Sequence, residues 1–476
     1  MSGKKAKAKC RELKTEGRIV SPHEIKNKKV NLSKAVEILD TVITESLCET
    51  IFKRLRTKER RRAWSLHAMV KFWNAVILHA PVSLRQALEE AGSGEGTQWP
   101  EVETSPEAFF QRSQNMSWRF FAALYGEFGR RMEKLADLGF AQEFQYLLKR
   151  FSQVYLIDGS ALDAIKRLLK GLRQEPATVL PGSILAAYDL FRGYAPILGF
   201  FENARESEMR RLETILEKIP QGSLLIADRI YATAKLFGIL AEKNLYALFR
   251  RHASLSLRRI RRVSRKRLPG GVLEDWLVQA GSGWNGTDQP MLRWIIFRSK
   301  KLGDYEFLTN VLDPRQLSAE EAMELYRCRW DVERLFYDIK EVLNLHRFYA
   351  GNVNAVAMQV YAAAMTHTAM RTAQSRIARQ AGIGAEAIST AKFFPRMAAA
   401  VYRRQMIKFG AQIIKEMNPE VTLKEPHWDR LNAGSVRLHQ ILVEPRKESP
   451  PRKDLRIKKN KSACKSLHLL TSHGQN

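Results

Sequence analysis

The feature that most constrains the fold is a change in apolar spacing near Val154. From Leu32 to about Arg150, apolar residues recur roughly every three to four positions, which is the period of amphipathic helices. After Val154 they come instead in short runs separated by turns, with helical stretches between the runs. Strands that alternate with helices in this way indicate an α/β layer. We therefore expect an all-helical N-terminal domain followed by an α/β domain.

The same patterns set the expected regions and their bounds. We expect a basic disordered tail, a helical domain, an α/β domain and a second basic disordered tail, at 1–31, 32–150, 151–443 and 444–476. Inside the α/β domain, the dense basic stretch 258–267 is followed by strand-like pieces and then by helices. This pattern predicts a β-rich insertion at about 252–312 and C-terminal helices from about 318.

The charge of the chain indicates a polyanionic partner. Its 79 Lys and Arg against 50 Asp and Glu give a formal net charge of +29, and the sequence pI is about 10.0. Nucleic acid is the commonest polyanion for such a protein, and a ribosomal-type or membrane-surface basic protein is the alternative. The basic run 53–62 fits either a helix-turn-helix-like reader of DNA or a plain helical bundle with a basic face. The tails fit either nonspecific phosphate binding or solubility alone.

Cysteine usage and hydropathy exclude several other classes of protein. Cys10, Cys48, Cys328 and Cys464 stand far apart and form no CxxC pair, so we expect neither a zinc site nor a disulfide framework. No apolar run approaches the roughly 18 to 20 residues of a membrane span, and the basic N-terminus lacks the apolar core of a signal peptide. We expect a reduced, intracellular protein without membrane contact.

Two aspartates stand at the ends of predicted strands. Asp158 ends the run VYLID, and Asp228 ends the run LLIAD. Because ligands and chemistry gather at the carboxyl ends of strands in α/β sheets, both are candidates for one site. The alternative is that each is an ordinary turn or helix-cap residue.

A third carboxylate lies on a predicted amphipathic helix that starts at Ser318. At about 100° per residue, Tyr326, Arg329, Glu333 and Lys340 line one polar stripe beside the core face. That core face holds Leu325, Cys328, Val332, Leu335, Phe336 and Ile339. The stripe is either a solvent face with local ion pairs or a set of groups that face one substrate. Three carboxylates would suit hard divalent cations, which need several oxygen ligands.

The spacing Tyr326-x2-Arg329-x3-Glu333-x6-Lys340 resembles the YREK signature of DDE transposases in the insertion sequence four family. The similarity is strongest from about 155 to 375. It implies an RNase H-like catalytic domain that is interrupted by the β-rich insertion before the glutamate helix, with the helical domain before it as a DNA-binding domain.

The resemblance also implies the composition of the active site. The motifs IDGS and IADRIY correspond to the first two acidic motifs, so the implied triad is Asp158, Asp228 and Glu333. This triad would hold two Mg2+ ions, with Mn2+ as an alternative metal, and no small-molecule cofactor is implied. In the family, the other three residues of the signature hold DNA phosphates, here Tyr326, Arg329 and Lys340.

The resemblance further implies that a flipped base stacks on an aromatic residue of the insertion. Three tryptophans are available for this role: Trp276, Trp284 and Trp294. Trp294, inside MLRWIIF, fits a core position better than a stacking position.

The implied partners are double-stranded DNA, both as transposon ends and as target, and a second copy of the chain on paired ends. The implied reaction is cut-and-paste transposition in the bacterial cytoplasm, on the nucleoid. The protein would bind terminal inverted repeats, cleave the ends of the element and join the 3′-hydroxyls to target DNA. One route of cleavage passes through a hairpin. Two other interpretations stay open. One is a noncatalytic or domesticated DNA-binding protein, and the other is an RNase H-fold nuclease without strand transfer.

Overall fold

The structure, a computed structural model, describes residues 14–15, 18–19, 435–437, 440–443 and most of 29–400. The gaps within 29–400 are 33, 56–61, 94–98, 101, 103, 163–181, 204–205, 282–288, 300–302, 346 and 350. Three expected features lie largely or wholly outside the described residues: the two basic tails, most of the basic run 53–62, and Trp284.

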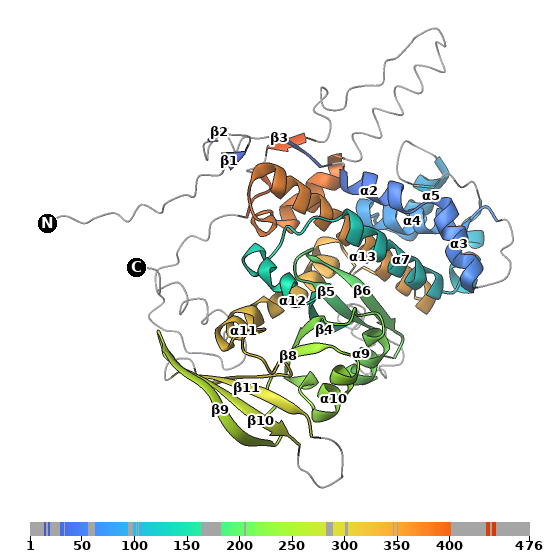
Figure 1. The fold of residues 1–476 in the computed structure, drawn as a ribbon. Coiled ribbons are helices and arrows are strands. Elements are labelled where there is room, and N and C mark those ends of the chain that lie inside the picture. Colours follow the sequence, from blue (N-terminus) through green and yellow to red (C-terminus); the bar gives the residue numbers. More distant parts are fainter. Residues whose placement is uncertain are drawn as a thin grey trace, which may run out of the picture.

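The N-terminal part of the chain is helical (Figure 1). It contains α2 (Lys34–Val42), α3 (Glu45–Leu55), α4 (Leu66–His79), α5 (Leu84–Ser93), α6 (Pro106–Asn115), α7 (Arg119–Leu135) and the 3-10 helix η1 (Gln142–Lys149). The Ser65 hydroxyl caps α4 by accepting a hydrogen bond from the Ala68 N–H at 3.1 Å. Helix α4 is buried along nearly its whole length, because α3 and the later helix α13 (Val353–Ala381) pack against it.

The centre of the molecule is a nine-stranded sheet in the order β6-β5-β4-β7-β8-β12-β11-β10-β9. Its strands are β4 (Val154–Ala161), β5 (Ser183–Asp189), β6 (Tyr194–Phe201), β7 (Leu224–Ala227), β8 (Tyr246–Arg250), β9 (Leu257–Leu268), β10 (Gly271–Ala280), β11 (Met291–Arg298) and β12 (Tyr305–Thr309). Strands β4, β7 and β8 are parallel to one another, and every other pair in the sheet is antiparallel.

The β-rich segment at 252–312 extends this sheet. Strand β12 pairs with β8, and β11, β10 and β9 follow it outward to the edge. The basic stretch 258–267, which carries no strand-like alternation of apolar residues, is part of the edge strand β9. The inserted segment therefore continues the sheet instead of forming a separate layer.

Helices cover both faces of the sheet, and each face has its own apolar cluster. Helices α9 (Glu208–Leu216) and α10 (Ala234–Glu242) pack on the face that includes Tyr155 and Leu225. The opposite face, which includes Leu156 and Ile226, packs against α11 (Ala319–Tyr326), α12 (Trp330–Tyr337) and α13. The cluster on this second face continues without a break into helices α2 to α7.

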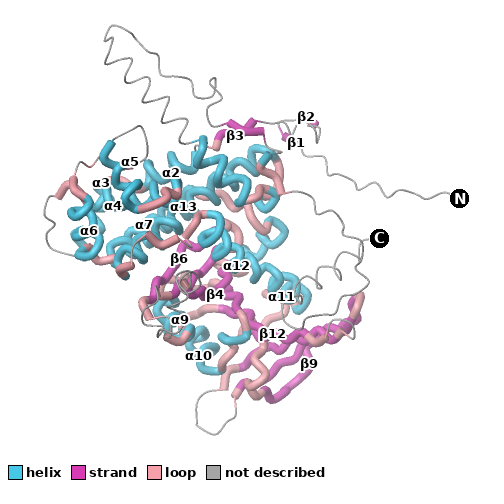
Figure 2. The backbone as a smooth tube through the Cα atoms, turned by 180° about the vertical axis from the view of Figure 1, so that it is seen from behind, coloured by secondary structure: helices cyan, strands magenta, loops and turns pink. Residues whose placement is uncertain are grey.

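Helix α13 joins the helical part to the sheet. It packs against α2, α4 and α7 on one side and against β6 on the other. Seen from behind in Figure 2, it runs among the N-terminal helices, while the sheet extends away from them. None of the helices that the structure describes is both long enough and apolar enough to cross a bilayer.

The predicted glutamate helix is helical throughout but not regular. It begins as predicted at Ser318, whose hydroxyl accepts from the Glu321 N–H while Glu321 accepts from the Ser318 N–H, which is a capping box. After α11 the chain makes a 3-10 turn (Arg327–Arg329), continues as α12 and ends in a π-helical turn (Asp338–Val342). The predicted core face is buried, with Cys328 only half-buried.

Candidate active site

Strands β4 and β7 carry the two candidate aspartates to the same end of the sheet. The two strands are parallel, and Leu156 of β4 pairs with Ile226 of β7. Asp158 lies two residues further along β4, and Asp228 directly follows the end of β7, so both are at the carboxyl end of this parallel pair. Because side chains alternate along a strand, the Asp158 carboxylate is on the face of Leu156, which is the face that α12 covers.

Helix α12 carries Glu333 across this face, and one arginine connects it to the sheet. The Arg329 guanidinium donates to Glu333 Oε1 at 2.8 Å, and its other terminal nitrogen lies 3.7 Å from Asp158 Oδ2. Arg329 is only 8% exposed, and its guanidinium also stacks on the Trp330 ring, 4.8 Å from the ring centroid. Thus the structure places Asp158 and Glu333 on opposite sides of one guanidinium.

The environment of Asp158 favours its neutral form more than water does. Burial raises the pKa of Asp158 to about 7, while the Arg329 guanidinium and the Gly159 N–H, which donates at 2.9 Å, both lower it. The carboxylates of Glu333 and Glu208 raise it further by repulsion. A group that is costly to ionise in the protein alone is stabilised as an anion when a cation is added.

Lys340 lies at the far end of the same strand. Its ammonium donates to Ser160 Oγ and to the Ala161 carbonyl oxygen, both at 2.7 Å. The lysine therefore ties the turn after α12 to the segment that directly follows Asp158, and its charge lies at the carboxyl end of β4.

Tyr326 is as buried as Arg329. It is 8% exposed, and its ring packs against Phe307 with 4.7 Å between the ring centroids. The 3-10 turn makes the helix irregular: each of its residues turns the chain by about 120° instead of 100°, so three residues add about 60°. The prediction of a regular helix is therefore wrong at this point, and the Tyr326 ring packs into the core.

The three carboxylates are not arranged as a preformed metal cage. Among the residues that the structure describes, no group of three or more His, Cys, Asp or Glu side chains could hold a metal ion. The donor chemistry nevertheless fits a hard divalent cation, because carboxylate oxygens are the ligands that such ions prefer. Arg329 supplies the positive charge between Asp158 and Glu333 in this structure.

One carboxylate beside the site was missed by the sequence analysis. Glu208, at the start of α9, accepts a hydrogen bond from the Tyr231 hydroxyl at 2.9 Å. A Cβ atom built on Gly159 would lie 3.3 Å from the Glu208 carboxyl group, so Glu208 is directly beside the residue that follows Asp158. Acidic residues are common in the first turn of helices, so Glu208 carried no separate signal.

Two of the three tryptophans considered for base stacking are already stacked. Arg259 lies over both Trp276 and Trp294, 4.8 and 4.9 Å from their ring centroids. Trp294 is buried as predicted, and its indole N–H donates to Glu306 at 2.9 Å.

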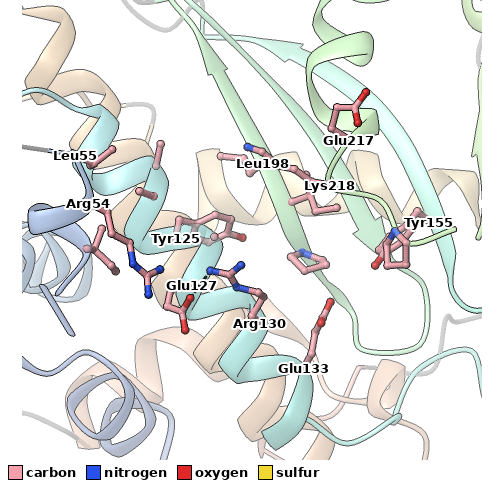
Figure 3. A pocket seen from close by; sticks show the side chains of 17 residues that line it. Arg54, Leu55, Tyr125, Glu127, Arg130, Glu133, Tyr155, Leu198, Glu217 and Lys218 are labelled. Carbon is pink, nitrogen blue, oxygen red and sulfur yellow. Dashed lines mark hydrogen bonds and ion pairs between the residues drawn. The ribbon is translucent and has the colours of Figure 1, made fainter. Parts of the chain in front are cut away.

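A cavity of about 700 Å³ lies away from these carboxylates, between α3, α7 and β6 (Figure 3). Its charged lining is balanced, with Arg54, Arg130 and Lys218 facing Glu127, Glu133 and Glu217. None of the candidate active-site residues lines it.

Comparison with known proteins shows a similarity to one family over part of the chain. Residues 183–369 match the sequence model of the family described as Transposase DDE domain. The matched segment includes Asp228, Glu333 and the three other signature positions, and Asp158 lies before it.

Two relatives are likewise named as transposases. One, from Sinorhizobium fredii, is 28% identical over 159 residues, which cover 33% of this chain and 44% of the relative. The other, from Geobacillus stearothermophilus, is named as a transposase for the insertion sequence element IS5377, and it is 25% identical over 204 residues, covering 39% of this chain and 53% of the relative. The matched part of the chain thus spans about half the length of these relatives or less. Together the matches support a DDE transposase.

A similar solved structure is a piggyBac transposase synaptic complex with hairpin DNA. The TM-score is 0.35 with 12% sequence identity, over 88% of this chain and 85% of that chain. A score of this size does not establish a shared fold.

Proposed function

We propose that the chain is a DNA transposase of a bacterial insertion sequence, of the insertion sequence four type with the YREK signature. The observation that carries the proposal is the parallel pairing of β4 and β7, since Asp158 in β4 and Asp228 after β7 are at the same end of the pair, and α12, the helix of Glu333, packs on β4. The mixed unit β6-β5-β4-β7-β8, with helices on both faces, supports an RNase H-like catalytic domain. The region 32–150 would then be the helical DNA-binding domain and 151–443 the catalytic domain.

Asp158, Asp228 and Glu333 are the proposed metal ligands. When bound, two Mg2+ ions, or Mn2+, would activate water or a DNA 3′-hydroxyl and stabilise the leaving oxygen of the phosphate. The three residues come from β4, from the end of β7 and from α12, and the packing of α12 on β4 sets the position of Glu333 relative to Asp158. Arg329 balances the charge of Asp158 and Glu333 and holds the two side chains near one another.

The signature cations are proposed to hold DNA phosphates at this edge. Lys340 is anchored on Ser160 and Ala161, so its charge is presented from the end of the strand that carries Asp158. Arg329 lies between two carboxylates, where its guanidinium fork can also bind a phosphate. Tyr326 packs against Phe307 and is proposed to hold Arg329 in position for this contact.

The reaction proposed for the whole protein is cleavage of double-stranded DNA at terminal inverted repeats, with a hairpin as one route, and joining of the freed 3′-hydroxyls to target DNA. Cutting and joining both ends of an element calls for two copies of the chain on paired ends. Such a protein works on the bacterial chromosome, in the cytoplasm.

The test is a cleavage and joining assay with a duplex that carries the element's end. We expect release of a 3′-hydroxyl, and its joining to a second duplex, only when Mg2+ or Mn2+ is present. Asp228→Asn should lower the cleavage rate by at least about a hundredfold, because one of three ligands loses its charge. The matched control is Asp313→Asn, which changes an exposed aspartate whose partner is Arg315.

The outcome separates the alternatives. Metal-independent activity, or full activity of Asp228→Asn, would reject the proposed site. If the protein cleaves DNA but does not join a pre-cut end, the result indicates an RNase H-fold nuclease. If it binds DNA without cleaving it, the result indicates a noncatalytic DNA-binding protein.

A further inference from the structure

The outermost strand of the sheet is the most concentrated positive surface among the described residues. In Figure 1, β9 forms the free edge of the sheet, away from the N-terminal helices. Its twelve residues include seven basic side chains and no acidic one, and all seven are exposed. They are Arg258, Arg259, Arg261, Arg262, Arg265, Lys266 and Arg267.

Two β-bulges put four of these arginines on one face. Ile260 and Val263 of β9 are not paired with any residue of β10. In a regular strand, residues three apart point to opposite faces; each bulge adds one residue and so restores the same face. Arg259, Arg262, Arg265 and Arg267 consequently pair with alternate residues of β10: Val278, Trp276, Glu274 and Val272. We call these four side chains the arginine row.

Two members of the row, Arg259 and Arg262, stack on aromatic rings. The guanidinium of Arg259 lies between Trp276 and Trp294, and that of Arg262 lies 5.7 Å from the centroid of Trp276. On the other side of Trp294, Arg251 stacks at 4.8 Å. This alternation of guanidinium and indole runs from β9 to the end of β8, the neighbour of the strand that leads to Asp228. Stacking on a ring orients a guanidinium but leaves its charge in place.

Few carboxylates neutralise the row. Arg265 pairs with Glu274 at 3.3 Å, and Glu274 also lies 3.5 Å from Arg298. Positive residues on an edge strand have a simpler use, since they prevent pairing with other strands. Protection of an edge strand requires neither that the arginines share one face nor that they stack on tryptophan. A ligand with regularly spaced negative charges requires guanidinium groups that are both evenly spaced and oriented toward it.

We propose that the arginine row binds the phosphate backbone of double-stranded DNA that flanks the cleaved end, an inference that rests on the proposed function. Alternate residues of a strand are about 6.7 Å apart, and phosphates follow one another every 3.4 Å of axis along one DNA strand. The row therefore spans about 20 Å, which is the axial length of about six base pairs. Backbone contacts of this kind position a duplex without reading its sequence.

The distance to the active site gives the location of this contact. Strand β9 is five strand intervals from β7, which corresponds to about 24 Å. On a duplex this is about seven base pairs from the phosphate bound near Asp228.

The experiment compares two double variants of the same strand. Arg262→Gln/Arg267→Gln removes two charges from the row, and Arg258→Gln/Arg261→Gln removes two charges from the opposite face. Binding to a mixed-sequence duplex of about 30 base pairs is measured over a range of salt concentrations, without divalent metal. We expect the row variant to bind about tenfold more weakly and its salt slope to fall by about 1.8. The opposite-face variant should change by less than half of this.

A charge-preserving variant keeps the test independent of folding. Arg262→Lys/Arg267→Lys should retain the wild-type salt slope, and thermal melting should show that all variants are folded. Equal losses for the two glutamine variants, or no loss for the row variant, would overturn the proposal. The proposal would also be overturned if the row variant bound duplex RNA more weakly than the wild type but bound duplex DNA equally well. A wild-type protein that binds no duplex DNA would overturn the proposed function too, whereas wild-type cleavage with an unaffected row variant would reject the row alone.

Discussion

At the scale of single residues, buried charges determine how the candidate site is supported. Arg329 holds Asp158 and Glu333 together, and a second arginine holds the chain that leads into the glutamate helix. Arg293 is fully buried in β11 and donates to Asp275 at 3.1 Å. It also donates to the carbonyl oxygens of Val311 and Leu317, at 3.2 and 2.7 Å. Arg293 therefore fastens the turn before α11 to the sheet.

Replacing Arg293 by Met should destabilise the protein severely. The change leaves the Asp275 carboxylate buried without its partner, which costs about 3 to 5 kcal/mol. The double variant Arg293→Met/Asp275→Leu should recover at least half of the loss, because no charge is then left buried. Urea unfolding of both variants measures this, and equal losses for the single and the double variant would contradict it.

Acid should destabilise the helical part through His79. This half-buried ring stacks on Trp99, and burial lowers its pKa to about 4. The unfolded chain binds the proton near pH 6.5 while the folded chain does not, so stability is complete above pH 6.5 and is lost as pH falls toward 4. The loss is at most about 3 kcal/mol.

The measurement is the free energy of unfolding between pH 7 and pH 4. His79→Phe should flatten this part of the profile, whereas His252→Gln, a change at an exposed histidine, should leave it unaltered. A profile of unchanged slope in His79→Phe would exclude this histidine as the cause.

At the scale of elements, local capping signals were predictable from the sequence and long-range irregularities were not. The start of α11 at Ser318 follows from residues three apart in the chain. The bulges of β9 depend on its register with β10, and the basic stretch has no apolar alternation that would reveal a strand. In the same way, the 3-10 turn that follows Tyr326 is not encoded in the regular spacing of the signature.

The capping box of α11 should contribute measurably to stability. Ser318→Ala removes the acceptor for the Glu321 N–H and should cost about 1 kcal/mol. Ser105→Ala is the matched control, because Ser105 stands at the N-cap of α6 without a side-chain hydrogen bond. Thermal unfolding of the two variants should differ, and equal shifts would show that the box adds nothing.

At the scale of the whole molecule, the site is assembled from segments far apart in the chain. Motifs in the sequence were enough to nominate Asp158, Asp228 and Glu333, because each motif is local. Their supports were not predictable, since Arg293, Glu208 and the stacked tryptophans act across strands and layers. The sequence predicted a β-rich insertion at about 252–312, but not that β12 of this segment would pair directly with β8.

The central claim is that Asp158, Asp228 and Glu333 act as one site. It is tested most directly by the single-turnover rate of DNA-end cleavage for Asp158→Asn, Glu333→Gln and the double variant. Groups that act as a unit have non-additive effects. We therefore predict that the double variant is no slower than the slower single variant, within about threefold. A double variant slowed by the product of the two single effects would contradict the account.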